Sequence, residues 1–527
     1  MTRRATPEPA PSDAARQAAD RLQEFRDLRA RGALCTEVTE QFATEAAASF
    51  LQQFGASGEY LADRIALLAE IATLEEQCLS EPGQHATFPL LVERLSDSFD
   101  PKLCGLYDRV FTQMISHARR LRAGARLDAA LQSFGLHTEK DFLERRSRLR
   151  HRPPWREAAE QRAVRRVLIL SRVTLGADVA VTSIVLQKAQ RLFPEARRVL
   201  LAPPKARELF GGDSSLEIRE VPYQSGGALL ERLESCLDVV AAVEDEIRSL
   251  QSGDYVLLDP DSRFLQLGLL PALHDESRYF FFESRSFDET VGSGGTATLS
   301  GLTVDWLNAT FGGEESFLPQ IYLRQQDEEF GRQLRRLLGA AGARCIVTMS
   351  FGAGGNDEKR LPDPFEEQLL TRLLAEGVTI VLDQGAGEVE SERALRLADS
   401  VRRSGRTVTE ISAESMRASA KNDSPLRCSM LTWQGGIGAW AGLIGASDEY
   451  IGYDSAGQHI AAALGVPAVD IFSANATLRF RERWRPSGKG IVRVVSVQEA
   501  MEGAKSSDSA LEEVLRAHRE IHNTKGR

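Results

Sequence analysis

The chain has 527 residues, and its 75 acidic and 65 basic side chains give a net charge of -10. That balance excludes a global positive field of the kind that attracts nucleic acid or anionic lipid, so no nucleic-acid partner is expected. The length fits about three domains, each large enough to bury its own core.

The six cysteines are scattered without a CxxC pair, which argues against a zinc knuckle or a disulfide scaffold. No apolar run approaches the roughly 20 residues needed to cross a bilayer. The first segment, MTRRATPEPAPSD, lacks the apolar core of a signal peptide. A cytoplasmic protein is therefore expected, and it could still act at the inner face of a membrane.

Residues 1–152 are expected to form an all-helical domain of about six helices after a disordered start of about 12 residues. LADRIALLAEIATLEEQCL and LCGLYDRVFTQMISHARRL carry apolar residues at spacings of three and four. Met114 and His117 lie at helical spacing, and core packing explains them better than metal binding. This domain could select an acceptor, form a homo-oligomer or bind a protein partner.

Residues 153–338 alternate apolar strands with helices, which indicates a parallel sheet covered on both faces, a Rossmann-like domain. The expected strands cover 166–171, 198–202, 216–221, 255–259 and 278–283, and the longest helices cover 178–192 and 228–250.

Residues 339–527 predict a second Rossmann-like domain, so the fold class is α/β with two parallel-sheet domains that face a cleft. The expected strands cover 345–350, 378–383, 407–411, 451–453, 468–472 and 491–495, with helices at 364–375, 389–403, 437–445 and 458–464. A basic and aromatic loop, LRFRERWRPSGKG, follows the fifth of these strands. A capping box at Ser509 and Glu512 predicts a last helix, so the chain is expected to end in an ordered element.

The segment 451–473, IGYDSAGQHIAAALGVPAVDIFS, organises the second Rossmann-like domain. It predicts a buried strand, a turn of small residues from Asp454 to Gly457, a short helix and another buried strand. In a parallel sheet this turn lies at the carboxyl ends of the strands, where the amides of a helix N-terminus can hold a phosphate.

LILSRVTLGADVAVTSIVLQKAQRLFPEA and IGYDSAGQHIAAALGVPAVDIFS resemble the opening and closing signatures of glycosyltransferase family 9, the relatives of ADP-heptose:lipopolysaccharide heptosyltransferases. DYVLLDPDSRFLQLGLLPAL resembles that family's strand-Asp segment between them. The resemblance spans roughly residues 165–498. Asp454, Ser455 and Ala456 stand where the family usually has Asp-Thr-Gly, and His459 stands at the family's distance from the Asp.

The resemblance implies a GT-B fold with an acceptor-binding first domain and a donor-binding second one. It also implies inverting transfer without an essential metal, from a nucleotide-diphosphate sugar as co-substrate and with no other cofactor. The acceptor could be a glycan, a lipid-linked glycan or a protein.

Inverting transfer needs a base for the acceptor proton and stabilisation of the departing diphosphate. Asp178 lies where the first strand's loop enters its helix, and it matches the family's catalytic aspartate. The positive end of that helix should keep its carboxylate ionised. The family commonly has Leu-Gly-Asp, whereas Ala177 is inserted here. An aspartate that only caps its own helix is the alternative.

Lys359 and Arg360 follow a glycine-rich loop, and a cation there can offset the charge of the β-phosphate. His459 would face the same phosphates, and Asp454 would orient the turn or a sugar hydroxyl. Solvated loop cations and a buried structural histidine are the alternatives. The expected catalytic residues are Asp178, Lys359 and His459. The expected donor-binding residues are Gly352, Gly354, Lys359, Arg360, Gly435, Gly436, Ile437, Asp454, Ser455, Ala456, Gly457 and His459.

Acceptor contacts are expected from residues after the first and fourth strands of the first Rossmann-like domain. These are Thr174, Gly176, Asp259, Asp261 and Arg263. The basic loop 479–485 could hold an anionic acceptor or the diphosphate. Trp433 or Trp440 could stack on a base, although a core role fits them equally.

Two other functions stay open, a nucleotide-sugar epimerase and a non-catalytic binding or scaffold protein. The epimerase would need no separate acceptor, and the altered Leu-Gly-Ala-Asp turn favours the scaffold. NAD-dependent oxidoreduction is disfavoured, because the first turn, SRVTLGAD, lacks GxGxxG.

Overall fold

The computed structural model describes residues 12–224, 227–287, 298–354, 357–412, 425–473, 476–497 and 507–524. The chain forms two compact units. The first unit comprises Met1–Arg152, Tyr223–Glu244 and Arg263–His274, and the second comprises Pro153–Pro222, Asp245–Ser262 and Asp275–Arg527. The domain boundaries expected from the sequence stay a prediction, and nearly all of the expected disordered start lies outside the described residues. No helix among the described residues has the length and apolar character needed to span a membrane.

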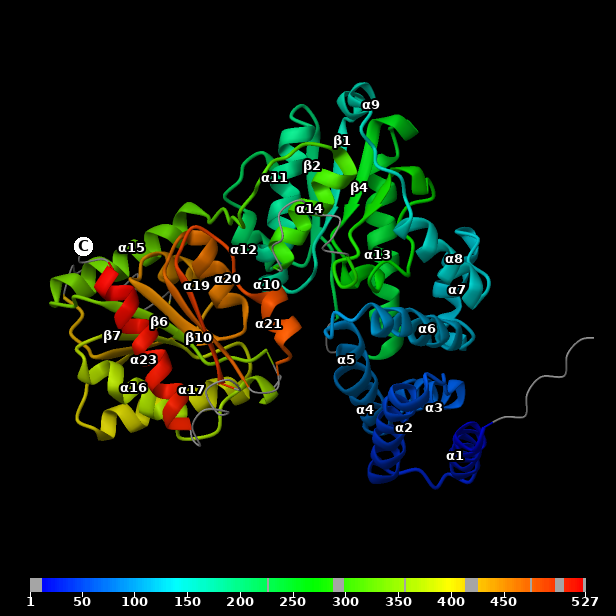
Figure 1. Ribbon diagram of the computed structural model, residues 1–527, viewed down its shortest axis with the longest axis horizontal. Coiled ribbons are helices and arrows are strands. Elements are labelled where there is room, and N and C mark those ends of the chain that lie inside the picture. Colours follow the sequence, from blue (N-terminus) through cyan, green and yellow to red (C-terminus); the bar gives the residue numbers. More distant parts are fainter. Residues whose placement is uncertain are drawn as a thin grey trace, which may run out of the picture. The chain divides into compact units, whose positions relative to one another are not determined.

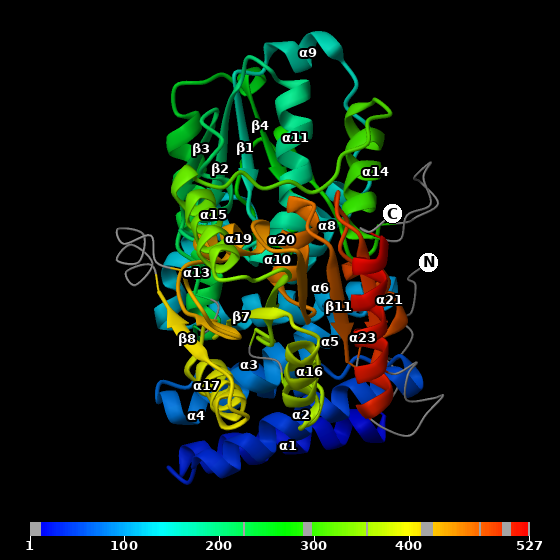
Figure 2. The same ribbon diagram turned by 90° about the vertical axis from the view of Figure 1, so that its left-hand side faces the viewer.

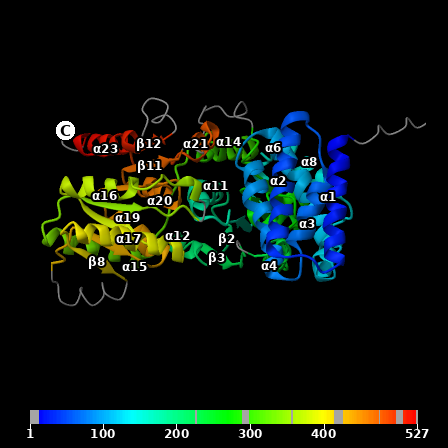
Figure 3. The same cartoon turned by 90° about the horizontal axis from the view of Figure 1, so that it is seen from below.

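The first unit is built from helices (Figure 3). They are α1 (Asp13–Ala30), α2 (Thr36–Ser57), α3 (Ala62–Ala72), α4 (Gln77–His85), the π-helix η1 (Ala86–Val92), α5 (Glu93–Ser96), α6 (Pro101–Ala118), η2 (Arg122–Gly124), α7 (Ala125–Ser133), α8 (Glu139–Arg150), most of α13 (Leu229–Ile247) and η5 (Arg263–Leu265). Residues 12–152 alone contain eight α-helices, more than the six expected there. Met114 of α6 is fully buried, as its spacing predicts. Arg145 of α8 donates to the Gly268 carbonyl at 2.7 Å, which attaches the later segment to the helices.

The first sheet of the second unit has five parallel strands in the order β3-β2-β1-β4-β5 (Figure 2). The strands are β1 (Arg166–Leu170), β2 (Arg197–Ala202), β3 (Leu216–Glu220), β4 (Tyr255–Asp259) and β5 (Tyr279–Phe281). The helices beside them are α9 (Ala158–Ala163), α10 (Leu175–Ala177), the π-helix η3 (Asp178–Thr182), α11 (Ser183–Leu192), α12 (Ala206–Phe210), η4 (Ser252–Asp254), η6 (Glu276–Arg278) and α14 (Leu299–Phe311). The strand order reverses between β1 and β4, and loops at such a switch point commonly bind ligands.

The second sheet has seven strands in the order β12-β11-β10-β6-β7-β9-β8, all parallel. They are β6 (Ile346–Ser350), β7 (Thr379–Asp383), β8 (Val408–Ile411), β9 (Met430–Trp433), β10 (Glu449–Tyr453), β11 (Ala468–Phe472) and β12 (Val492–Ser496). The helices are α15 (Gln325–Ala340), η8 (Asp357–Lys359), α16 (Phe365–Ala375), α17 (Glu388–Arg403), α19 (Ile437–Gly445), α20 (Ala456–Leu464), α21 (Leu478–Trp484) and α23 (Ser507–Thr524).

Apolar side chains on both faces of the second sheet explain its two helical layers. Figure 1 shows α16, α17 and α23 on one face and α19 and α20 on the other. Leu369, Ala398 and Val514 from the first three helices pack against Val347 and Ile451 of the central strands. The switch point lies between β6 and β10, so the loops that follow these two strands meet at one edge.

The α/β fold with two parallel sheets after a helical region is confirmed. Two local expectations were wrong. The basic segment after β11 is the helix α21, because the Thr477 side chain accepts from the Phe480 amide at 3.1 Å and caps it. Ser509 lies inside α23, which begins at Ser507, so it does not start a capping box there. The cleft between the two Rossmann-like domains stays a prediction.

Candidate functional site

The switch point of the second sheet brings together a lysine and an aspartate 95 residues apart. Lys359 ends η8 after β6, and Asp454 follows β10. The Lys359 Nζ lies 2.8 Å from the Asp454 Oδ2 and 3.3 Å from the Asp454 carbonyl. The lysine side chain is 32% exposed and the aspartate 8%. The ammonium therefore keeps contact with solvent and can reach an anionic ligand there.

The turn that carries Asp454 also starts helix α20. The Ser455 amide donates to the Gln458 Oε1 at 2.7 Å, and the Gln458 Nε2 donates to the Asp454 Oδ1 at 3.0 Å. This capping box holds the turn, in line with the orienting role expected for Asp454. Ala456 and Gly457 occupy the first helical positions, where amides have no intrahelical acceptor and carry partial positive charge.

Gly457 has a packing reason as well as a ligand-binding one. A Cβ at this position would lie 2.1 Å from the Tyr450 hydroxyl oxygen. The fully buried Tyr450 ring therefore requires glycine here. Close approach of a phosphate is not needed to explain the residue.

His459 lies in the first turns of α20 and is 4% exposed. Its pKa is lowered from 6.5 to about 4, chiefly by burial; the charge of Asp454 opposes this shift and that of Lys359 adds to it. The ring is therefore neutral at pH 7, and one nitrogen can donate while the other accepts. Its ring centroid is 5.9 Å from that of Trp484 on α21. A Cβ built on Gly176 would lie 3.1 Å from the His459 Cδ2, which fits a glycine at that position.

A second buried carboxylate near this site was missed by the sequence analysis. Asp470 lies on β11 with no exposed surface, and neither of its carboxylate oxygens has a hydrogen-bond partner among the described residues. Burial raises its pKa well above the ordinary value, Asp454 raises it further and Lys359 opposes the rise. An acidic residue within the apolar strand AVDIF was the signal that could have revealed it.

Asp178 lies at the switch point of the first sheet and is 1% exposed. Its Oδ2 accepts from the Ser171 hydroxyl at 2.7 Å. Its Oδ1 accepts from the Arg172 amide and the Thr182 hydroxyl, both at 2.7 Å. Burial raises the pKa of Asp178, while these donors and the Arg172 charge oppose that rise. The carboxylate thus holds the loop after β1 to the following helix.

The extra residue Ala177 precedes a π-helical turn from Asp178 to Thr182, in which the Ser183 amide donates to the Asp178 carbonyl. A π-turn holds one residue more than an α-turn, and such turns are frequent at functional sites. The helix thus accommodates the insertion in this turn. Thr174 is the N-cap of α10, one turn before Asp178.

The other acidic residues at this edge are bound within the second unit. The Asp259 Oδ2 accepts from the Tyr279 hydroxyl at 2.5 Å, and its Oδ1 accepts from the Ser262 amide at 2.7 Å. Burial raises the pKa of Asp259 to about 7. Asp261 is 2% exposed and pairs with Arg285. Acceptor contacts by these carboxylates stay a prediction.

Arg263 begins a segment assigned to the first unit, and its acceptor contact stays a prediction. Arg172 was missed by the sequence analysis. Its buried guanidinium donates to the Pro260 carbonyl at 3.1 Å and to the Ser284 hydroxyl at 2.8 Å. It thus joins the loops after β1 and β4.

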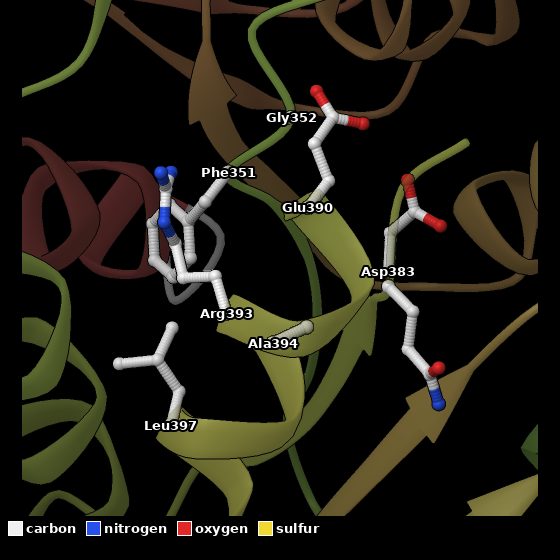
Figure 4. A pocket seen from close by; sticks show the side chains of 8 residues that line it. Phe351, Gly352, Asp383, Glu390, Arg393, Ala394 and Leu397 are labelled. Carbon is white, nitrogen blue, oxygen red and sulfur yellow. The ribbon is translucent and has the colours of Figure 1, made fainter. Parts of the chain in front are cut away.

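The glycine loop after β6 and the loop after β7 donate hydrogen bonds to a carboxylate of the chain itself. The Glu390 Oε1 accepts from the Ala353 amide at 3.0 Å and the Gly354 amide at 3.2 Å, and its Oε2 accepts from the Ala386 amide at 3.1 Å. Figure 4 shows this side chain beside Gly352 in a small pocket. Of the residues expected to bind a donor, Gly354 thus has its amide engaged by a side chain of α17.

The second glycine turn is occupied in the same way. The Glu208 Oε2 of α12 accepts from the Gly438 amide at 2.9 Å, at the start of α19, which begins at Ile437. A Cβ on Gly436 would lie 2.5 Å from this oxygen, and one on Gly435 would lie 2.3 Å from the Trp433 ring.

Neither tryptophan of this region is available to a base. Trp433 is 1% exposed and Trp440 3%, so both belong to the core. The core alternative left open by the sequence is the one observed.

Arg360 pairs with a different carboxylate from the one that Lys359 contacts. Its Nη2 lies 3.3 Å from the Glu366 Oε1, and the Tyr453 hydroxyl donates to the same oxygen at 3.2 Å. Burial raises the pKa of Glu366 to about 7, against the charge of Arg360. On α21, Arg483 is buried and Arg481 donates to the Ser496 hydroxyl, so these two bases are engaged within the unit.

No protein-family model matches the sequence, and no curated protein is significantly similar to it. Among solved structures, a glycosyl transferase family 9 protein from Veillonella parvula is 14% identical, covers 68% of this chain and 97% of its own, and has a TM-score of 0.48. The ADP-heptose lps heptosyltransferase II of E. coli is 15% identical, covers 68% and 99%, and has a TM-score of 0.42. A UDP-N-acetylglucosamine 2-epimerase is 10% identical, covers 66% and 90%, and has a TM-score of 0.33.

Proposed function

We propose that this chain is a glycosyltransferase that moves a sugar from a nucleotide-diphosphate sugar to an acceptor hydroxyl. One observation carries the proposal: the partly exposed Lys359 ammonium lies beside the first turn of α20 at the switch point of a parallel sheet. A cation with solvent access beside a positive helix end suits a diphosphate. The sequence resemblance also implies that the donor binds at this turn.

Lys359 would exchange its ion pair with Asp454 for the β-phosphate, whose charge grows as the sugar leaves. The amides of Ala456 and Gly457 would bind the same phosphate, and neutral His459 would add a hydrogen bond without a charge of its own. Asp454 would keep the turn in place through Gln458. Because these groups supply the positive potential, the proposed transfer needs no metal at the donor site.

Asp178 is the base of the proposed inverting step. A raised pKa strengthens a carboxylate as a base near neutral pH. In this step its Oδ2 would exchange the Ser171 hydroxyl for the acceptor hydroxyl and take its proton, while the acceptor oxygen displaces the diphosphate from the sugar. Whether the transferred sugar is a hexose or a heptose is what a donor panel determines.

A second candidate is a non-catalytic protein that binds a partner on this fold. Glu390 accepts from the Gly354 amide, which was expected to bind the donor, and Glu208 accepts from the Gly438 amide beside the expected residues Gly436 and Ile437. Both oxygens of the Asp178 carboxylate also accept hydrogen bonds from inside the chain. A chain that has lost its chemistry can fill former ligand positions with its own side chains.

The experiment is a panel of UDP-, GDP- and ADP-sugars measured by thermal shift and by slow donor hydrolysis. A transferase is expected to bind the sugars of one nucleotide and to hydrolyse them slowly. Lys359→Met should lose binding and hydrolysis. Lys140→Met, which changes an exposed lysine on α8, is the control and should retain them. Formation of an epimer would instead favour the epimerase. Absence of binding across the panel would contradict the transferase and favour the scaffold.

A further inference from the structure

A cluster of metal-binding side chains lies at the amino ends of the second sheet, the opposite edge from Lys359. Glu449 is the first residue of β10, and His518 and His522 lie one turn apart on α23. The His518 Nδ1 is 2.5 Å from the Glu449 Oε2, and the His522 Nε2 is 2.8 Å from the same oxygen. One ligand atom from each residue falls within 4.8 Å of the other two.

The Glu449 carboxylate has no exposed surface, and its Oε1 has no hydrogen-bond partner among the described residues. Both imidazoles point at Oε2 alone. A buried carboxylate is costly unless both oxygens are bound, and two histidines that share one oxygen do not achieve that. The Glu449 Oε1 is therefore available as an acceptor for a positive ligand.

Cys345 supplies a fourth donor. It directly precedes β6, and its Sγ lies 3.7 Å from the His522 Nε2. Zinc bonds of about 2.3 Å to sulfur and about 2.1 Å to nitrogen place these atoms about 3.6 Å apart at a tetrahedral angle. The observed distance of 3.7 Å between the Cys345 Sγ and the His522 Nε2 is close to this value without any rearrangement of the side chains.

We propose that Glu449, His518, His522 and Cys345 bind one Zn²⁺ ion. Two imidazoles, a carboxylate and a thiolate are zinc donors, and together they fill a closed tetrahedral site. The oxygen and nitrogen atoms must separate to about 3.3 Å around a metal. Glu449 can do this by turning Oε1 toward the ion. Binding releases the Cys345 thiol proton and any proton shared between the imidazoles and the carboxylate.

The ion would have a structural role. It would tie the last helix to the starts of β6 and β10, which no covalent bond joins locally. The His522 side chain is 27% exposed, which gives an entry path from solvent. The site lies a strand's length from the Lys359 edge, so metal occupancy should change stability and leave nucleotide binding unchanged.

The test is metal content and cobalt spectroscopy of the full chain. We expect one zinc per chain after dialysis against equimolar Zn²⁺, and a higher Tm than after chelation. With Co²⁺ we expect the visible bands of a tetrahedral site and a near-ultraviolet thiolate charge-transfer band. No bound metal, no cobalt bands and an unchanged Tm would overturn the proposal and leave a hydrogen-bonded carboxylate-imidazole cluster.

Variants locate the ion. Cys345→Ser should remove the charge-transfer band, whereas Cys428→Ser, a half-buried cysteine of the same sheet region, should retain it. His522→Gln, at the partly exposed position, should lower zinc affinity at least tenfold while the chain stays folded. Retention of one tightly bound zinc in both Cys345→Ser and His522→Gln would place the metal elsewhere and contradict the proposal.

Discussion

The carboxyl edges of the two parallel sheets gather charged side chains in different ways. At the first sheet, Asp178 and Asp259 are buried and each accepts hydrogen bonds from its own neighbourhood. At the second sheet, Lys359 keeps a third of its side chain in solvent, and the first turn of α20 presents amides beside it. The carboxylates at the first edge are bonded within the chain, whereas the second edge has a cation and helix amides that can bind an anionic ligand.

The difference indicates where binding energy for an anionic ligand can come from. A ligand at the second edge replaces one ion pair that is partly in solvent, which costs little. A ligand at the first edge must displace buried hydrogen bonds, each costly to leave unmade. We therefore expect substitutions at the two edges to act on different quantities.

Asp178→Asn should have the largest effect. If Asp178 is the base, kcat falls about 10²–10⁴-fold, since an amide cannot take the acceptor proton. The affinity for nucleotide diphosphate, measured by calorimetry, stays unchanged because the donor edge is intact. Asp245→Asn, in an exposed pair with Arg219, is the control. Near-normal turnover with a lowered Tm would leave Asp178 a purely structural residue.

Lys359→Met and Arg360→Met test neighbouring cations with different partners. Loss of Lys359 should lower kcat about 10²–10³-fold, as for removal of one transition-state donor, and should weaken donor binding. Loss of Arg360 should lower the free energy of unfolding by about 1–3 kcal/mol, because Glu366 loses a buried partner. Donor titrations measure the affinity, and denaturant unfolding measures the stability of each variant. Equal loss of donor affinity in the two variants would contradict the assignment of donor binding to Lys359 and of stability to Arg360.

His459 should give the second edge a pH dependence. Its folded pKa of about 4 lies below the ordinary 6.5, so the unfolded chain binds a proton first as the pH falls. Stability from this group is complete above pH 6.5 and is lost on going down toward pH 4, with a slope of at most about 1.4 kcal/mol per pH unit.

The measurement compares the wild type with His459→Gln by denaturant unfolding across that range. Buried acids such as Asp259 act in the opposite direction, but they are common to both proteins, so the difference isolates His459. Parallel stability curves for the two proteins would show that the imidazole is not held neutral.

Tyr279→Phe should have the smallest effect and acts at the first edge. It removes the hydroxyl that donates to the Asp259 Oδ2, and should lower the free energy of unfolding by about 1–2 kcal/mol. Donor affinity should not change. A change in nucleotide affinity without a change in stability would mean that this carboxylate contacts ligand.

The sequence determined the strands, because buried parallel strands are continuous apolar runs whose ends are visible as turns. The 255–259 and 468–472 strands agree with β4 and β11 at both ends. The turn at Asp454 and the helix after it were also predictable, since small residues and a helix start are local signals. Lys359 was placed at a strand end by the glycine loop before it.

Only the tertiary structure decided which groups those ends meet. Glu208 reaches the Gly438 amide across 230 residues, and His522 meets Glu449 across 73. A periodic pattern reports whether a residue is buried, whereas the partner of a buried charge depends on strand order and helix packing. For that reason the sequence indicated the Lys359 edge but neither the carboxylates that occupy its neighbouring amides nor the proposed zinc ligands.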